Sequence, residues 1–221
     1  MIEITPELSY FPEAFRSCNV YLLTCLDCAV LFDPSISPDK VISERPITKL
    51  IATHAHYDHI GSVNVWKQEV PDRPFLMHPG DIPMLDDSSA NASVFFGRPG
   101  AFAHPDHELS DEEVIKIDRE YSIRVLNTPG HTMGSSCFII YRQVGHEPKP
   151  VALITGDTLF DCGWGRTDFI TGDDTLMRRS LERLYRVLID MPPNLPVCPG
   201  HAGLTTAEEA CRFLRMMRFT G

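Results

Sequence analysis

The order of the patterned segments predicts an α/β protein of the α+β type, with two β-sheets covered by helices. Strand patterns come in runs, and amphipathic helix patterns fall between and after those runs instead of alternating with single strands. With 221 residues, 43% of them hydrophobic, the chain can bury a sizeable core. Pro and Gly are spread along the sequence and no linker divides it, so we expect one domain over residues 1–221.

The N-terminal half begins the first run of strands. Short segments rich in Val, Leu, Ile and aromatic residues predict strands over residues 19–26, 28–33, 49–53 and 75–77. Three- and four-residue spacing of apolar side chains predicts a helix that carries Ile60, Val63, Trp66 and Val70. Residues 82–110 are weakly patterned and long for a loop, which favours a functional flap.

The C-terminal half continues with strands and ends in helices. Strand patterns cover residues 114–118, 122–127, 136–142 and 151–155, and a short one lies near 196–197. Asp173 or Asp174 can cap a helix with Met177, Leu181, Leu184 and Leu188 on its apolar face. Thr206 and Glu209 have the spacing of a capping box, which predicts the start of a last helix.

Charge and hydropathy limit the partners. The chain has 20 Lys and Arg against 30 Asp and Glu, a net charge of −10 that disfavours nucleic acid. The densest basic run, Arg178, Arg179, Arg183 and Arg186, is interleaved with apolar residues as on a helix face. Apolar runs are of strand length and the N-terminus has no signal-peptide pattern, so we expect a cytoplasmic protein with reduced cysteines and no membrane partner. We expect a small-molecule substrate; the oligomeric state stays open.

Four metal-capable side chains stand within six residues: His54, His56, Asp58 and His59. They follow a buried strand and precede a helix, and alternation along an extended chain points His54 and His56 the same way. The turn into the helix then brings Asp58 and His59 to the same side as His54 and His56. Burying so much polarity without a partner is costly, which favours a metal site over a solvated turn.

Three more candidate ligands each follow a strand and a glycine: His131, Asp157 and His201. A ligand at a strand end is held by the sheet, and the glycine lets the backbone approach an ion. Five imidazoles and two carboxylates exceed the needs of one ion. They suit two ions with one bridging carboxylate.

These motifs, in this order from residue 19 to 201, resemble the metallo-β-lactamase superfamily. The resemblance implies a four-layer αββα sandwich, with two mixed β-sheets flanked by helices. It also implies the ligand sets: His54, His56 and His131 for the first ion, and Asp58, His59 and His201 for the second. Asp157 then matches the bridge.

A narrower resemblance points to the glyoxalase II-like hydrolase branch. It rests on the segments Gly-Asp-Thr-Leu-Phe at 156–160, Gly-Arg-Thr-Asp-Phe at 165–169 and Gly-His-Thr-x-Gly-Ser-x-Cys-Phe at 130–138. Glyoxalase II proper adds a C-terminal helical domain whose basic residues bind glutathione, whereas only residues 202–221 follow His201 here. The shorter members without that domain are therefore the closer match.

The resemblance implies a binuclear metal-dependent hydrolase acting on a small thioester or ester. Two divalent ions can lower the pKa of a shared water toward about 7, so that a metal-bound hydroxide attacks the carbonyl carbon. Asp58 is a ligand that also suits orientation of the hydroxide. Nitrogen and oxygen ligands favour zinc, with iron or manganese as alternatives. Thr53, Ser135 and Asp168 are candidates for holding the imidazoles, and Arg166 and Asp168 for a structural ion pair.

Other functions remain open. Persulfide dioxygenases share the Gly-Arg-Thr-Asp-Phe segment, and that resemblance implies one iron held by His131, Asp157 and either His54 or His56. A lactonase and a non-catalytic metal-binding module are further alternatives. The remaining histidines, His78, His104, His107 and His146, are expected outside the metal site.

Overall fold

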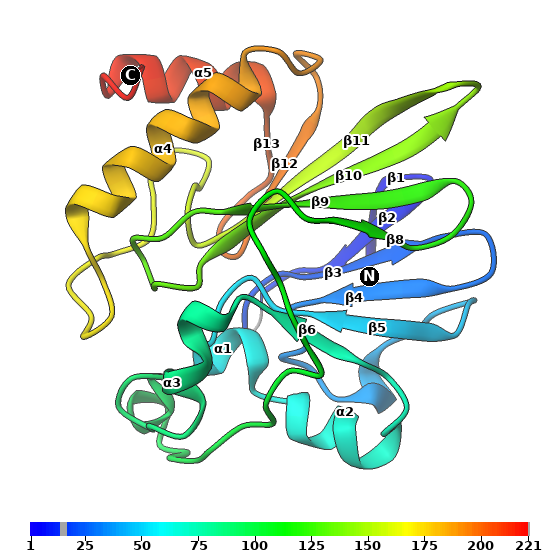
Figure 1. Cartoon of the computed structure of the whole chain (residues 1–221), viewed down its shortest axis with the longest axis vertical. Coiled ribbons are helices and arrows are strands. Elements are labelled where there is room, and N and C mark those ends of the chain that lie inside the picture. Colours follow the sequence, from blue (N-terminus) through cyan, green and yellow to red (C-terminus); the bar gives the residue numbers. More distant parts are fainter. Residues whose placement is uncertain (14–16, 221) are drawn as a thin grey trace. The chain divides into compact units, whose positions relative to one another are not determined.

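Each half of the chain forms one β-sheet covered by helices (Figure 1). The structure, a computed structural model, describes residues 1–13 and 17–220. Residues 1–109 and 110–221 make up two units, which are described separately below. The predicted pair of mixed sheets with flanking helices is confirmed, while the single domain over residues 1–221 stays a prediction.

The first unit contains a seven-stranded sheet in which the strands follow chain order. These are β1 (Ile2–Thr5), β2 (Leu8–Phe11), β3 (Val20–Thr24), β4 (Ala29–Phe32), β5 (Ile47–Ile51), β6 (Phe75–Met77) and β7 (His107–Glu108). The pairs from β1 to β4 are antiparallel and those from β4 to β7 are parallel. Helices α1 (Tyr57–Ile60), α2 (Val63–Glu69) and α3 (Ile82–Leu85) supply apolar side chains that pack on the sheet, among them Ile60, Trp66 and Leu85.

Several expectations for this unit are confirmed. β3, β4 and β6 lie where strands were predicted. The backbone N–H of Cys25 bonds the carbonyl of Cys28 at 2.8 Å across the turn between β3 and β4. Strands β1 and β2 were not foreseen. The predicted helix is divided in two at Gly61 and Ser62, residues of low helix propensity.

The stretch 82–110 is built from short elements. It holds α3, β7 and a 3-10 turn, η3 (Ser93–Phe96), and another 3-10 turn, η2 (Pro79–Asp81), precedes it. The buried Asn91 donates its side-chain amide to the carbonyl of Gly100 at 3.1 Å. The long loop expected from the sequence is thus an internally bonded segment.

The second unit contains a six-stranded sheet in the order β13-β12-β11-β10-β9-β8. Its strands are β8 (Val114–Lys116), β9 (Tyr121–Asn127), β10 (Ser136–Val144), β11 (Glu147–Gly156), β12 (Pro196–Pro199) and β13 (Thr205–Thr206). β11 and β12 run parallel, and the other pairs are antiparallel. This sheet is mixed as well.

Two amphipathic helices, α4 (Asp174–Leu188) and α5 (Ala207–Met216), pack on this sheet. Asp173 caps α4 by accepting from the N–H of Leu176 at 2.8 Å, and Thr206 caps α5 by accepting from the N–H of Glu209 at 3.3 Å. Both predicted helix starts are confirmed.

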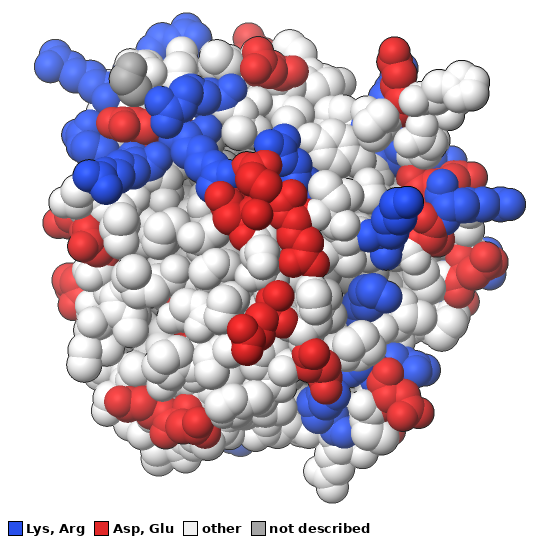
Figure 2. All heavy atoms as spheres, viewed as in Figure 1, with Lys and Arg blue, Asp and Glu red and all other residues white. Residues whose placement is uncertain are grey.

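No helix among the described residues is long and apolar enough to cross a membrane. Figure 2 shows basic side chains gathered over α4 and α5. The exposed arginines of these helices and the residues just after them are Arg178, Arg179, Arg186, Arg212, Arg215 and Arg218. The sequence alone indicated only the arginines of α4. It did not predict a patch, because the arginines of α5 lie far from them along the chain.

Candidate metal centre

The first unit supplies four of the predicted ligands. His54 and His56 lie in the turn between β5 and α1, and Asp58 and His59 lie in α1 itself. The three imidazoles are buried and Asp58 is half-buried. The His54 and His59 rings lie 4.0 Å apart between centroids. The structure therefore brings the three imidazoles of this motif together as expected.

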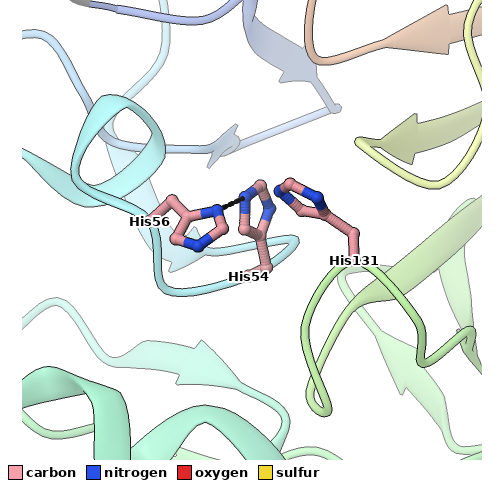
Figure 3. A group of neighbouring side chains, drawn as sticks. All are labelled: His54, His56 and His131. Atoms are coloured by element: carbon pink, nitrogen blue, oxygen red, sulfur yellow. Dashed lines mark hydrogen bonds between the residues drawn. The ribbon is translucent and has the colours of Figure 1, made fainter. Parts of the chain in front are cut away.

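Nε2 of His54 lies 3.1 Å from Nδ1 of His56, the contact dashed in Figure 3. Two nitrogens bound to one tetrahedral zinc lie about 3.3 Å apart, because each Zn–N bond is about 2.0–2.1 Å. The observed separation therefore suits two ligands of a single ion. The third ring in Figure 3 is His131, which belongs to the second unit.

The buried carboxylate of Asp33 holds this half of the site. It accepts the backbone N–H of Thr53 at 2.7 Å, the Thr53 hydroxyl at 3.0 Å and Nδ1–H of His59 at 2.9 Å. Asp33 follows β4 with φ of 55°, a conformation uncommon for a residue other than glycine. The Asp33 carboxylate therefore contacts both the turn after β5, at Thr53, and helix α1, at His59.

The same bonds fix which ring nitrogens carry protons. A carboxylate only accepts, so His59 carries its proton on Nδ1 and presents the lone pair of Nε2. The Thr53 hydroxyl donates to Asp33, and it is then free to accept from Nδ1–H of His54 at 3.1 Å. In both imidazoles Nε2 is then the nitrogen with the lone pair, which is the tautomer that metal binding through Nε2 requires.

Thr53 thus takes the supporting position predicted for it. Ser135 and Asp168 do not: Ser135 bonds Thr132 at 2.7 Å between hydroxyls, and Asp168 pairs with Arg166. The predicted ion pair is confirmed as a bidentate contact with both bonds at 2.6 Å, and the guanidinium also lies over the Phe169 ring. Asp33 was not predicted to support the site, although an Asp directly after a buried strand could have indicated that role.

The second unit supplies the other three predicted ligands from the ends of three strands. His131 follows β9, Asp157 follows β11 and His201 follows β12. Oδ2 of Asp157 lies 3.5 Å from Nε2 of His131 and 3.8 Å from Nε2 of His201. The Asp157 carboxylate therefore lies near one ring nitrogen of each of these two histidines. His131 is buried, whereas His201 keeps 30% of its side chain exposed.

Backbone groups orient the ligands of this unit. The carbonyl of Arg166 accepts Nδ1–H of His131 at 2.7 Å, which leaves Nε2 facing Asp157. A Cβ on Gly165 would lie 2.1 Å from the Asp157 carbonyl oxygen and 2.9 Å from Nδ1 of His131, so this position admits only glycine. The N–H of Gly200 bonds the carbonyl of Gly156 at 2.8 Å and ties the two strand ends together.

The other histidines lie outside these ligand groups. His104 pairs with Asp86 at 2.9 Å on the surface, and both His107 and His146 are exposed. Nδ1 of His78 accepts the N–H of Gly80 at 3.1 Å and caps the η2 turn.

Burial raises the pKa of both Cys18 and Cys137 to about 11, so these thiols stay protonated near neutral pH.

A family model of the metallo-β-lactamase superfamily matches residues 14–201, a stretch that contains all seven predicted ligands. The chain belongs to the metallo-β-lactamase superfamily. The family identified from the sequence is therefore confirmed, and its fold agrees with the two mixed sheets described above.

Three similar proteins place the chain within this superfamily. A protein of Haemophilus influenzae named hydroxyacylglutathione hydrolase GloC is 30% identical over 192 residues, covering 83% of this chain and 84% of that protein. The crystal structure of the B3 metallo-β-lactamase BLEG-1 is 31% identical with a TM-score of 0.75, covering 91% and 95%. The di-iron-bound form of TTHA1623 is 27% identical with a TM-score of 0.76, covering 93% and 98%.

Proposed function

We propose that this protein is a binuclear metal-dependent hydrolase of a small thioester or ester. The observation that carries the proposal is the donor chemistry of the two units. His54 and His59 each have Nδ1 engaged, and Nε2 of His131 and His201 faces the Asp157 carboxylate. Nitrogen and oxygen donors of this kind suit zinc, iron or manganese.

Under this proposal, His54, His56 and His131 hold one ion, Asp58, His59 and His201 hold the other, and Asp157 bridges them. Two bound divalent ions supply Lewis acidity and a water of lowered pKa. The chain's own contribution is orientation: Asp33, Thr53 and the Arg166 carbonyl keep each Nδ1 proton in place. Asp58 is the ligand best suited to align the attacking oxygen, because it is only half-buried.

Two similarities support a thioester or ester. The similar protein from Haemophilus influenzae is named a hydroxyacylglutathione hydrolase. The segment from Gly165 to Phe169, which the glyoxalase II-like branch shares with persulfide dioxygenases, shapes the site directly: Gly165 makes room for His131 and the Arg166 carbonyl orients it. Arg166 and Asp168 also form an ion pair within this segment.

The test combines metal analysis with three substrates: an S-acyl thioester, a lactone and a chromogenic β-lactam. We expect about two divalent ions per chain and hydrolysis of the thioester. Asp157→Asn should lower both, whereas Asp161→Asn, an exposed neighbour, should change neither. One equivalent of iron without zinc, together with no thioester hydrolysis, would contradict the proposal. Oxygen uptake with glutathione persulfide would then favour a mononuclear dioxygenase.

A further inference from the structure

Two cysteines lie opposite each other at the turn that joins β3 to β4. Cys25 directly follows β3, and Cys28 directly precedes β4. The register of the two strands pairs Thr24 with Ala29, and the backbone N–H of Cys25 bonds the carbonyl of Cys28 at 2.8 Å. The two cysteines are therefore the next opposed pair of the hairpin, and the two residues between them form its turn.

The side chains of this pair have the placement that a disulfide needs. Opposed residues of an antiparallel pair carry their side chains on the same face. The Cα atoms of a hydrogen-bonded pair lie about 5.5 Å apart, within the roughly 4.4–6.8 Å that disulfides span. The sulfur atoms of Cys25 and Cys28 lie within 4.8 Å of each other. Rotation of the two side chains can therefore bring the sulfurs to bonding distance while the strands stay paired.

The two thiols differ in their access to solvent. Cys28 is partly exposed, whereas Cys25 is only 6% exposed. Of the other five cysteines, Cys162 is exposed and the rest are buried. Burial also raises the pKa of Cys137 and Cys198, which keeps these two thiols protonated and unreactive. A small thiol reagent therefore reaches Cys28 first, and Cys25 lies directly beside it.

We propose that Cys25 and Cys28 form a redox-active dithiol, which closes to a disulfide by exchange with a low-molecular-weight disulfide such as glutathione disulfide. The Cys28 thiolate attacks one sulfur of glutathione disulfide, the bond between the two glutathione sulfurs breaks, and one glutathione thiolate leaves. The Cys25 thiolate then attacks the Cys28 sulfur and releases the second glutathione. Two protein thiols are oxidised, one glutathione disulfide is reduced to two glutathiones, and the two thiol protons pass to the leaving thiolates.

The dithiol lies apart from the candidate metal ligands of its unit. Cys28 precedes β4 and Asp33, which supports His59, follows it. The four residues of β4 span about 13 Å at about 3.3 Å per residue. The inference therefore goes beyond the proposed hydrolase and does not depend on it. Closure of the disulfide should leave the metal content and the hydrolysis of thioesters unchanged.

The experiment uses the Cys162→Ser protein, which lacks the other exposed thiol and keeps six of the seven cysteines. The folded protein is equilibrated with mixtures of reduced and oxidised glutathione, quenched in acid, unfolded and alkylated, and its mass is measured. We expect six alkylated thiols in reduced glutathione, and four without bound glutathione in oxidised glutathione. Peptide mapping should place the bond between Cys25 and Cys28.

Two further variants in this background assign the two steps. Cys25→Ala should retain one glutathione on Cys28, because no neighbouring thiol releases it. Cys28→Ser should retain none, because Cys25 is buried. Cys211→Ser is the matched control, since Cys211 is 7% exposed and Cys25 is 6% exposed. It should still form the disulfide.

Six alkylated thiols at every ratio of the two glutathiones would overturn the dithiol, as would a disulfide that joins other cysteines. The thiol count of the Cys162→Ser protein decides this even if a further variant fails to fold, and circular dichroism reports the fold of each. Loss of thioester hydrolysis by the metal-loaded wild type would contradict the hydrolase proposal alone.

Discussion

The two units present their candidate ligands in different ways. In the first unit, four candidate ligands stand within six consecutive residues, and the side chains of Asp33 and Thr53 orient two of them, His54 and His59. In the second unit, the ligands come from three separate strand ends, and backbone carbonyls and glycines orient them. One half relies on side-chain chemistry and the other on main-chain geometry.

This difference predicts that substitutions disturb the candidate ligands of the two units in different ways. A single conservative substitution in the first unit can change which ring nitrogen carries the proton without moving the backbone. In the second unit a main-chain carbonyl, that of Arg166, accepts from Nδ1 of His131, so changing this bond requires the main chain to move. The predictions below test this contrast.

The largest effect is expected from Gly165→Ala. The added Cβ would overlap the Asp157 carbonyl and Nδ1 of His131, so the main chain must move and displace both ligands. We expect a loss of activity of about a hundredfold or more, since misplacement by about 1 Å costs that much, and a destabilisation of about 1–3 kcal/mol. Metal titration, thioester hydrolysis and urea unfolding measure these effects.

Gly163→Ala is the control for that substitution. Its Cβ would find its nearest neighbour, a Phe160 ring atom, at 4.0 Å. Wild-type activity is expected. An equal loss in both variants would mean that mobility of the loop matters, and not the close approach at Gly165.

The next effect is that of Asp33→Asn in the first unit. The amide can still accept from Thr53, but its NH2 group would face the Nδ1 proton of His59, so the ring must rotate or change tautomer. We expect metal affinity to fall by about 10–100-fold and the fold to remain. Calorimetric metal titration measures the affinity, and circular dichroism reports the fold.

Asp27→Asn, in the exposed hairpin turn of the same unit, serves as the reference variant and should bind metal like the wild type. If Asp33→Asn also bound metal normally, orientation by this carboxylate would be irrelevant. The contrast between the two units would then fail.

A smaller effect is expected from Thr53→Val. The valine keeps the shape but removes the hydroxyl that links Asp33 to Nδ1 of His54. We expect a reduction in metal affinity of about tenfold, and Thr53→Ser should recover it. If Thr53→Ser also bound metal weakly, the hydroxyl alone would not account for the affinity of the wild type.

The smallest effects concern two ion pairs, one in each unit. Asp106 accepts from Lys67 at 2.7 Å, and Asp111 accepts from Arg183 at 2.8 Å. Burial raises the pKa of each carboxyl. The hydrogen bonds and charges of Lys67 and Arg183, together with backbone N–H bonds from Phe75 and Asn127, outweigh it and hold the pKa below the ordinary value of 3.8. Each pair therefore stabilises the fold above pH 3.8 and loses this contribution as the pH falls through the lowered pKa.

Asp106→Asn and Asp111→Asn should each lower the free energy of unfolding at pH 7 by less than about 1 kcal/mol, because the carboxylates are partly exposed. The difference from the wild type should shrink toward pH 3. Urea unfolding at both pH values measures it. A difference that grows on acidification would contradict the assigned direction.

Local patterns predicted much of the fold and the ligand set. Strands β3, β4 and β6 and the caps of α4 and α5 follow from apolar runs and capping residues, which depend on near neighbours alone. Strands β1 and β2 were not predicted because each is only four residues long. They form because β1 pairs with β2 and β2 pairs with β3 in the sheet.

The sequence was sufficient to list seven metal-capable residues and the superfamily, because each ligand carries a recognisable local motif of histidine or aspartate beside a turn. It did not reveal the role of Asp33 or of the Arg166 carbonyl. Asp33 lies 26 positions from His59 and Arg166 lies 35 from His131, so contact between them depends on how the strands pair. The fold alone brings such distant partners within hydrogen-bonding distance, and with them it fixes which nitrogen of each imidazole can bind a metal.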